Sequence, residues 1–552
     1  MTSVGRAAAL TGGLIAAGTA LGFLRDLLMA HLFGASGSTD AFLVAWTIPE
    51  TVSPLLIEDA MALLMVPVVT RLLARGDGLR PLVGATLPRM ALGLAAVTLA
   101  LVVAAPALVD VLAPGLTEPG PAVECVRLTA ITVVTFGVAG FMSASLRAHH
   151  RFGPPAAIYV AYNMGILLLI AGLADVTGIM SAALGVACGG FLMIAVQAPA
   201  FVRCLRESPR PAVRDVSDVW VGVAAIAPIV VYTVTRQSQV FVERFFGSEL
   251  AAGSISHLNY AQKVAQVPMV LSLMVVTVTF PRLARASADG DIGAVARRVQ
   301  HDLAVASAMV LAATAFLVAF APTVIRLLFE HGQFTSTDTG STASIMRVYA
   351  LGLWGQSAVG LAARAFFAQR RPTWRPAAVL CAGLAVTAVI GGLFAASGGT
   401  VALAAANAAG ITLAAVLLLV GLRTGVAPVS LRRVGSDLAR LVVAAAGAYG
   451  AGALTAALLG DGTPPVVELA VGGTVTGVAF AVLLVLAGPR PVTSWVASWI
   501  ALGPLVRRGR TESGESIEPA DGKMVSDRVA ASGAGHPAGA AGADVPLGRS
   551  LR

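Results

Sequence analysis

The chain has 552 residues, of which 57% are hydrophobic and 12% are charged, and its mean hydropathy is +0.83. Soluble domains carry about 25% charged residues, so this composition excludes an ordinary soluble protein. The formal net charge of +9 would point to nucleic acid in a soluble chain. Here we expect the arginines to face anionic lipid, and we expect no nucleic-acid partner.

Fourteen long apolar segments follow one another along the chain. They lie near residues 7–32, 40–70, 88–113, 122–146, 155–175, 179–202, 217–246, 255–281, 299–328, 340–368, 375–397, 400–422, 436–459 and 465–488. Most exceed the roughly 20 residues that cross a hydrocarbon core. Since a spanning segment must satisfy its own backbone hydrogen bonds, we predict an all-α, polytopic membrane protein with about fourteen transmembrane helices.

Arginine collects in every second connection between these segments, for example at Arg147 and Arg151 or at Arg203 and Arg206. The intervening connections, such as residues 114–121 and 460–464, contain no Lys or Arg. Because positive charge stays on the cytosolic side of a membrane, this alternation predicts that both termini are cytosolic. The first segment contains Arg25 and Asp26 and is too long for a signal-peptide core, so we expect it to remain as the first span.

A weak internal repeat relates the two halves of the chain. Phe33-Gly34, Gly37-Ser38 and Pro49 recur as Phe246-Gly247, Gly253-Ser254 and Pro268. Six spans separate the copies, so the repeat is parallel and predicts two pseudo-symmetric six-helix lobes with a substrate site between them. Chance similarity within an apolar, low-complexity sequence is the alternative.

The predicted organisation has four parts. They are an N-terminal six-helix lobe at 1–206, a C-terminal six-helix lobe at 207–425, two extra transmembrane helices at 426–490 and a cytosolic tail at 505–552. The tail is rich in Gly, Ala, Ser and charge, so it cannot bury enough apolar surface to fold, and we expect it to be disordered.

Charged residues inside the predicted spans are the candidates for function, because charge in the membrane is costly. They occur in the first two spans and in the seventh and eighth, which are the matching spans of the repeat. They are Arg25, Asp26, Glu50, Glu58, Asp59, Arg236, Glu243, Arg244 and Lys263. This distribution predicts a polar cavity between the lobes. The alternative is that several of these residues only pair with one another or extend to the membrane surface.

Several ordered motifs resemble the MurJ/MviN family, whose members are lipid II flippases within the superfamily of multidrug, oligosaccharidyl-lipid and polysaccharide exporters. The similarity covers roughly residues 5–425. The motifs are Leu21-Gly-Phe-Leu-Arg-Asp, Ser38-Thr-Asp-Ala-Phe, Asn259-Tyr-Ala-Gln-Lys and Leu327-Leu-Phe-Glu-His-Gly-Gln-Phe.

The resemblance implies a flippase that moves lipid II, or a related polyprenyl-diphosphate-linked glycan, across the bacterial plasma (inner) membrane by alternating access for peptidoglycan and cell-wall synthesis. Its partners would be that glycolipid, membrane lipids and cell-wall synthesis proteins. Arg25, Asp40 and Glu58 match family positions, and Lys263 stands where the family has Arg. With the charged residues of the seventh span added, the predicted substrate-binding residues of the cavity are Arg25, Lys263, Asp40, Glu58, Arg236, Glu243 and Arg244. Of the acids, we expect Glu58 to be structural or gating, held by a base such as Arg25.

The chain also departs from the family pattern. The second-span arginine pair is replaced by Ser53-Pro54, another arginine of the first span is missing, and Glu50 and Asp59 are added acids. Four bases then face six acids within the spans, counting Asp40 with the acids, and a diphosphate needs positive surroundings. We therefore expect lipid II to be moved less efficiently than by a member with the full arginine set.

Two other functions remain open. One is a cation-coupled exporter of small molecules, which the extra acids favour, and the other is a non-transporting scaffold for cell-wall assembly. We expect no enzymatic activity, no catalytic residue, no cofactor and no metal, since no nucleotide-binding loop or metal-type spacing occurs and Cys125, Cys188, Cys204 and Cys381 are scattered. Membrane potential or an ion gradient is expected to drive the cycle.

Overall fold

The computed structural model describes residues 3–58, 60–75, 78–207, 223–269, 289–369, 373–460, 462–489 and 492–493. Within these ranges all regular secondary structure is helical. Asp59, the second half of the eighth predicted span and the predicted tail at 505–552 lie outside the described residues.

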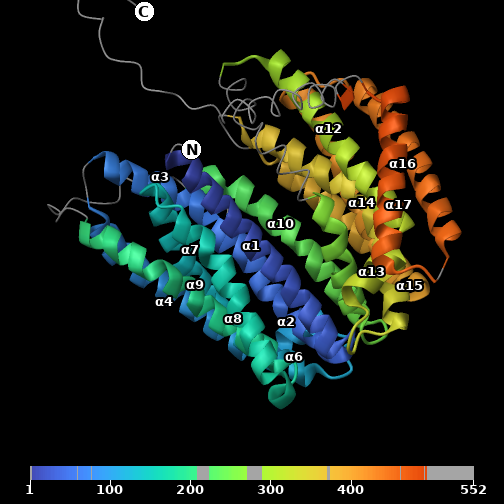
Figure 1. Ribbon diagram of the computed structural model, residues 1–552. Helices are drawn as coiled ribbons and strands as arrows, with labels where there is room; N and C mark the ends of the chain where they lie inside the picture. Colours follow the sequence, from blue (N-terminus) through green and yellow to red (C-terminus); the bar gives the residue numbers. More distant parts are fainter. Residues whose placement is uncertain are drawn as a thin grey trace, which may run out of the picture. The chain divides into compact units, whose positions relative to one another are not determined.

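Ten helical elements make up the described residues before 208, which we call the N-terminal bundle, drawn blue to teal in Figure 1. They are α1 Ser3–Phe33, α2 Gly37–Ser53, the π-helix η1 Pro54–Glu58, α3 Ala60–Ala74, α4 Leu79–Val103, α5 Ala105–Leu112, α6 Pro119–Thr129, α7 Thr132–Ala148, α8 Gly153–Thr177 and α9 Met180–Glu207. In this bundle α8 packs on α9 and α1, α6 packs on α2, and α7 packs on α9 and α3.

The described residues after 222 form the C-terminal bundle, drawn green to orange in Figure 1. Its helices are α10 Val223–Ser248, a helix at residues 254–269, α12 Ile292–Ala319, α13 Ala321–Phe329, α14 Ser336–Phe367, α15 Arg375–Gly425, α16 Leu431–Leu459 and α17 Pro465–Ala487. Gly399 interrupts α15 with non-helical dihedrals, φ 59° and ψ −148°, so α15 consists of two helices that meet at this residue. Glycine adopts this positive φ without the steric cost that other residues meet.

The all-α membrane fold is confirmed. Among the described residues, ten helices are long and apolar enough to cross a membrane. Each of the fourteen predicted segments contains helix where it is described, and the break at Gly399 falls between the predicted segments 375–397 and 400–422. The count of fourteen spans and the lobe boundaries remain predictions.

Polar residues fix the starts of several helices. Ser36 caps α2 by accepting a hydrogen bond from the Thr39 backbone amide, and Thr335 and Asp338 form a reciprocal capping box at the start of α14. Such caps satisfy amides that have no partner inside the helix. They mark the starts of α2 and α14, where the chain turns back.

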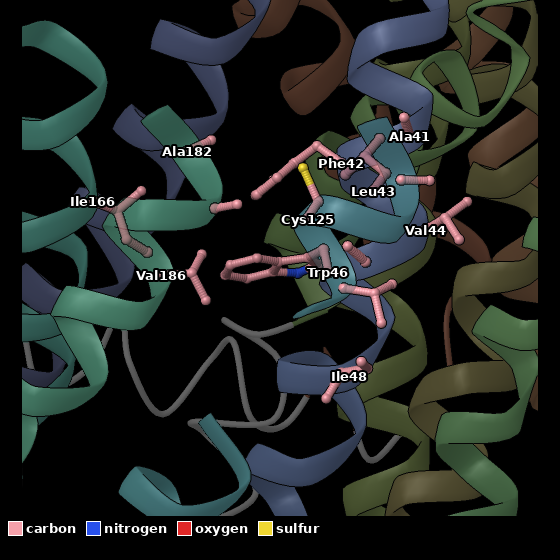
Figure 2. Close-up of a cluster of buried hydrophobic side chains, with 14 of the residues drawn as sticks. Ala41, Phe42, Leu43, Val44, Trp46, Ile48, Cys125, Ile166, Ala182 and Val186 are labelled. Atoms are coloured by element: carbon pink, nitrogen blue, oxygen red, sulfur yellow. The ribbon is translucent and has the colours of Figure 1, made fainter. Parts of the chain in front are cut away.

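The core of the N-terminal bundle surrounds α2. Figure 2 shows the indole of Trp46 pointing from α2 toward Val186 of α9, with Cys125 of α6 nearby. The Trp46 ring also lies 6.3 Å from the Tyr162 ring and 5.8 Å from the Phe42 ring, measured between centroids. This packing holds α2 in place, and α2 also contacts α10 of the other bundle, as do η1, α3 and α5.

Two prolines in and after α2 free backbone carbonyls, because proline has no N–H to donate to the residue four positions earlier. Pro49 leaves the carbonyl of Ala45, which accepts a hydrogen bond of 3.2 Å from Thr129 Oγ1. Pro54 leaves the carbonyl of Glu50, which accepts a hydrogen bond of 2.7 Å from Gln237 Nε2 of α10. The second proline thus gives α2 an anchoring point on the opposite bundle.

Candidate functional site

A cavity of about 650 Å³ lies between the two bundles and is lined by side chains from both. Four of the seven predicted site residues line it, namely Arg25 and Glu58 from the N-terminal bundle and Arg236 and Lys263 from the C-terminal bundle. Asp40, Glu243 and Arg244 are not among its lining residues, which corrects their expected place in the cavity wall.

Arg25 of α1 is held rigidly at the cavity wall. Its Nη2 lies 2.7 Å from Asp26 Oδ1, and its guanidinium carbon lies 4.1 Å from the centre of the Trp46 ring. Asn163 Oδ1 of α8 accepts a third, longer contact of 3.5 Å from Nη1. The Asp26 pair and the stacking on Trp46 orient the guanidinium in advance of any ligand.

Glu58 has a different partner from the one expected. Its Oε1 accepts a hydrogen bond of 2.6 Å from the Tyr159 hydroxyl, and that hydroxyl lies 3.0 Å from Ser53 Oγ. Arg25 instead pairs with Asp26. The sequence did not single out Tyr159, since its contact with Glu58 forms only when α8 packs beside η1. Glu58 is the last residue of this π-helical turn.

Lys263 faces an acid from the opposite bundle. Its Nζ lies 3.2 Å from Glu50 Oε1, and Arg244 Nη2 lies 4.0 Å from Glu50 Oε2. Arg244 is 3% exposed and also donates a 3.4 Å hydrogen bond to Asn259 Oδ1. Glu50 therefore joins the cavity to a buried arginine behind its wall.

Asp40 bridges the two bundles at another place. Its carboxylate accepts hydrogen bonds of 2.7 Å from the Gly253 amide, 2.7 Å from the Ser256 amide and 2.5 Å from Ser256 Oγ. These donors belong to the start of the helix at 254–269, where a carboxylate is favoured by the unpaired amides and the helix dipole. Asp40 is thus an intramolecular cap for a helix of the other bundle.

The same end of the molecule is closed by backbone contacts. The Gln333 amide donates a 2.9 Å hydrogen bond to the His31 carbonyl. Gly34, Gly253 and Gly332 all have positive φ there, and a Cβ on any of them would meet a carbonyl oxygen of the facing bundle. Residues 33–38 and 247–254, two further connections without Lys or Arg, therefore meet in the structure.

Glu243 lies behind two lining residues of the C-terminal bundle. It is 3% exposed, and its Oε1 accepts hydrogen bonds of 2.5 Å from Asn407 Nδ2 and 3.4 Å from Gln239 Nε2.

Arg236 is exposed to the cavity and forms no ion pair with a residue that the structure describes. No group of three His, Cys, Asp or Glu side chains suited to a metal occurs in the described part of the chain.

A family model described as lipid II flippase MurJ matches residues 29–462. The chain belongs to the lipid II flippase MurJ family. A lipid II flippase MurJ of Burkholderia cenocepacia is 26% identical over 421 residues, covering 73% of this chain and 80% of the relative. A probable lipid II flippase MurJ of Vibrio cholerae is 26% identical over 419 residues, covering 73% and 79%.

The solved structures that resemble this MurJ-family chain share its fold. A lipid II flippase MurJ in an inward closed conformation superposes with a TM-score of 0.72 at 19% identity, covering 86% of this chain and 98% of that one. An inward-facing multidrug resistance MATE family transporter superposes with a TM-score of 0.59 at 15% identity, covering 74% and 94%. The polytopic transporter fold expected from the sequence is confirmed.

The charge balance of the cavity in this MurJ-family chain differs from the sequence expectation. The charged lining residues are Arg25, Arg236 and Lys263 against Glu50 and Glu58, which gives three minus two, or +1. Asp26, Asp40 and Glu243 do not line the cavity, although Asp26 pairs with the lining residue Arg25 and Glu243 accepts hydrogen bonds from the lining residues Asn407 and Gln239. Asp59 is not described. The sequence count of four bases against six acids covers the spans, and only some of these residues line the cavity, because sequence position does not show which side of a helix faces the cavity.

Proposed function

We propose that this chain is a flippase that moves lipid II, or a related polyprenyl-diphosphate-linked glycan, across the bacterial plasma membrane for peptidoglycan synthesis. Family membership supports the substrate class. The observation that carries the proposal is the cavity between the bundles, to which each bundle contributes basic side chains. A cationic site formed by two bundles can hold an anion while the bundles move, so that the site opens first to one side of the membrane and then to the other.

The diphosphate is the part of this substrate that the cavity residues suit best. Arg25 offers a planar guanidinium fixed by Asp26 and Trp46, Lys263 offers a mobile ammonium, and Arg236 is exposed to the cavity. Charge-assisted hydrogen bonds to phosphate are stronger than neutral ones, particularly in a partly dry site. Transport needs no covalent chemistry, and membrane potential or an ion gradient is proposed to drive the cycle.

Rescue of bacteria depleted of their own lipid II flippase tests the proposal. We expect this chain to restore growth only partly, because Ser53 and Pro54 stand in place of the family's arginine pair. Each missing charge-assisted contact to phosphate costs about 1.5–3 kcal/mol. The measurement is growth rate and lipid II exposure at the outer surface, with membrane abundance matched by immunoblot.

The Ser53→Arg variant should improve the rescue, since it returns a base to the cavity wall. Full rescue by the native chain would refute the weakened site while establishing the flippase. Failure of both chains, at normal membrane insertion, would favour the small-molecule exporter or the scaffold.

We also propose that both termini are cytosolic, which single cysteines can test after the four natural cysteines are replaced. Cysteines at positions 118 and 462, both exposed, should react with a membrane-impermeant maleimide from outside intact cells. A cysteine at position 150, between Arg147 and Arg151, should react only after permeabilisation. External labelling at position 150 would overturn the orientation.

A further inference from the structure

We infer that the Glu50 carboxylate competes with the substrate for Lys263. It pairs with Lys263 when the cavity is empty, and an anionic substrate must displace it to bind. This inference rests on the proposed function and adds a specificity-determining residue to it. The displacement makes the cavity favour headgroups with more negative charge, such as a diphosphate, over headgroups with less, such as a monophosphate.

The contacts of Glu50 cross the boundary between the two bundles. Glu50 lies on α2, whereas Lys263 lies on the helix at 254–269 and Arg244 on α10. The Lys263 contact is 3.2 Å and the Arg244 contact is 4.0 Å, one to each carboxylate oxygen. Glu50 is the acid of the described cavity lining that pairs with a base. The other lining acid, Glu58, is bonded to Tyr159.

The backbone of Glu50 is fixed as well as its side chain. Because Pro54 cannot donate to the Glu50 carbonyl, Gln237 Nε2 of α10 occupies that carbonyl at 2.7 Å. The carboxylate is thereby presented to the C-terminal bundle at a defined place. Glu50 and Pro54 thus act together, and both are departures from the family pattern.

The carboxylate is incompletely satisfied by its partners. Glu50 Oε2 and Arg244 Nε are buried and form no hydrogen bond with any residue that the structure describes. A separation of 4.0 Å between Oε2 and Arg244 Nη2 is an electrostatic contact and too long for a hydrogen bond. A buried ion pair with unmet hydrogen bonds is poorly stabilised, so a better anion can replace it.

Charge decides which ligands can replace it. A phosphate monoester, with a charge of about −1.5 to −2 at neutral pH, gains less at Lys263 than a diphosphate, which brings additional charge to the same bases. A neutral compound brings no charge with which to replace Glu50 at Lys263, and a cationic compound would compete with Lys263 for Glu50 and would not bind Lys263. When Glu50 is displaced from Lys263, one contact between α2 and the helix at 254–269 is lost. Substrate binding therefore favours separation of the bundles at this point.

Binding of farnesyl diphosphate and farnesyl monophosphate to the purified chain in lipid nanodiscs tests the inference. The native chain should prefer the diphosphate. Glu50→Gln should raise affinity for the monophosphate by about tenfold, as expected for removal of one charged competitor, and should raise affinity for the diphosphate less. Glu50→Asn serves as a second, shorter variant should Glu50→Gln not fold.

Two comparisons separate displacement from a general loss of negative charge. Glu58→Gln removes the same charge from the same cavity, but Glu58 is bonded to Tyr159, so the monophosphate gain should be far smaller. In a Lys263→Ala background, Glu50→Gln should give little or no gain, because the principal base that it would free is absent.

Equal gains from Glu50→Gln and Glu58→Gln, or no gain from either Glu50 variant, would overturn the inference. Absence of binding by the native chain and by every variant would instead reject the anion site of the proposed function. Binding of both probes by the native chain, unaffected at position 50, would leave the flippase proposal standing and reject the role of Glu50 alone.

Discussion

Replacing Asp40 with Asn should open the end of the molecule at which residues 33–38 meet residues 247–254. Asp40 accepts three hydrogen bonds from Gly253 and Ser256 of the opposite bundle. Asn keeps one acceptor oxygen and turns an amino group toward a donor. The loss of a buried charge-assisted contact, about 1.5–3 kcal/mol, should shift the closed population by roughly 10- to 150-fold.

Disulfide formation between cysteines placed at positions 37 and 252 measures this closure. A Cβ on Gly37 would lie 3.7 Å from Ala252 Cβ, within the roughly 3.5–4.5 Å that a disulfide requires. The cross-linking rate under mild oxidation should fall in the Asp40→Asn variant. Asp175→Asn, at an exposed position late in α8, is the matched control and should leave the rate unchanged. An unchanged rate for Asp40→Asn would show that the backbone contacts alone hold this end closed.

Replacing Lys263 with Ala should abolish transport. Lys263 is a base of the cavity lining, and its loss would also leave Glu50 without its nearest charged partner. Removing one partner of a buried ion pair costs about 3–5 kcal/mol, and the cost here is smaller because the pair is partly exposed and Arg244 remains 4.0 Å from Glu50. The readout is rescue of flippase-depleted cells, and Lys263→Arg should retain activity because the positive charge and its reach are kept.

Arg25→Ala should have a similarly large effect, since it removes the guanidinium that Asp26, Trp46 and Asn163 orient. Arg89→Ala, on an exposed position of α4, is the control for loss of one arginine and should behave as the native chain. Normal transport by both Lys263→Ala and Arg25→Ala would mean that the cavity does not hold the anionic part of the cargo.

The sequence predicted the helices well because hydropathy and arginine alternation are local properties. Residues such as Lys263 and Arg236 could also be placed on the cavity, since charge within a span has few other stable locations. Local patterns do not show which helix faces which. Lys263 and Glu50 are 213 residues apart, and their pairing follows only from the packing of the two bundles.

The acids illustrate the same limit. The sequence assigned the leading role to Glu58 with Arg25 as its base, whereas Arg25 pairs with its neighbour Asp26 and Glu58 with Tyr159. Glu50, noted only as a departure from the family, holds the contacts to the opposite bundle. Pro54 was a signal that could have revealed this, because its missing donor leaves the Glu50 carbonyl in need of a partner.

The glycines at the closed end have a thermodynamic consequence for the transport cycle. Where Gly34, Gly253 and Gly332 let the backbones approach, the bundles are joined by polar groups, such as the Gln333 amide on the His31 carbonyl. Water can replace such a bond at a net cost of only about 0.5–1.5 kcal/mol, whereas separating apolar side chains costs about 25 cal/mol for each Å² exposed. One elementary charge crossing 100 mV supplies about 2.3 kcal/mol. Each backbone hydrogen bond at this end is therefore comparable in free energy to the work that an ordinary membrane voltage does on one charge, whereas apolar contacts such as that of Phe23 with Phe329 add to the stability of the closed state.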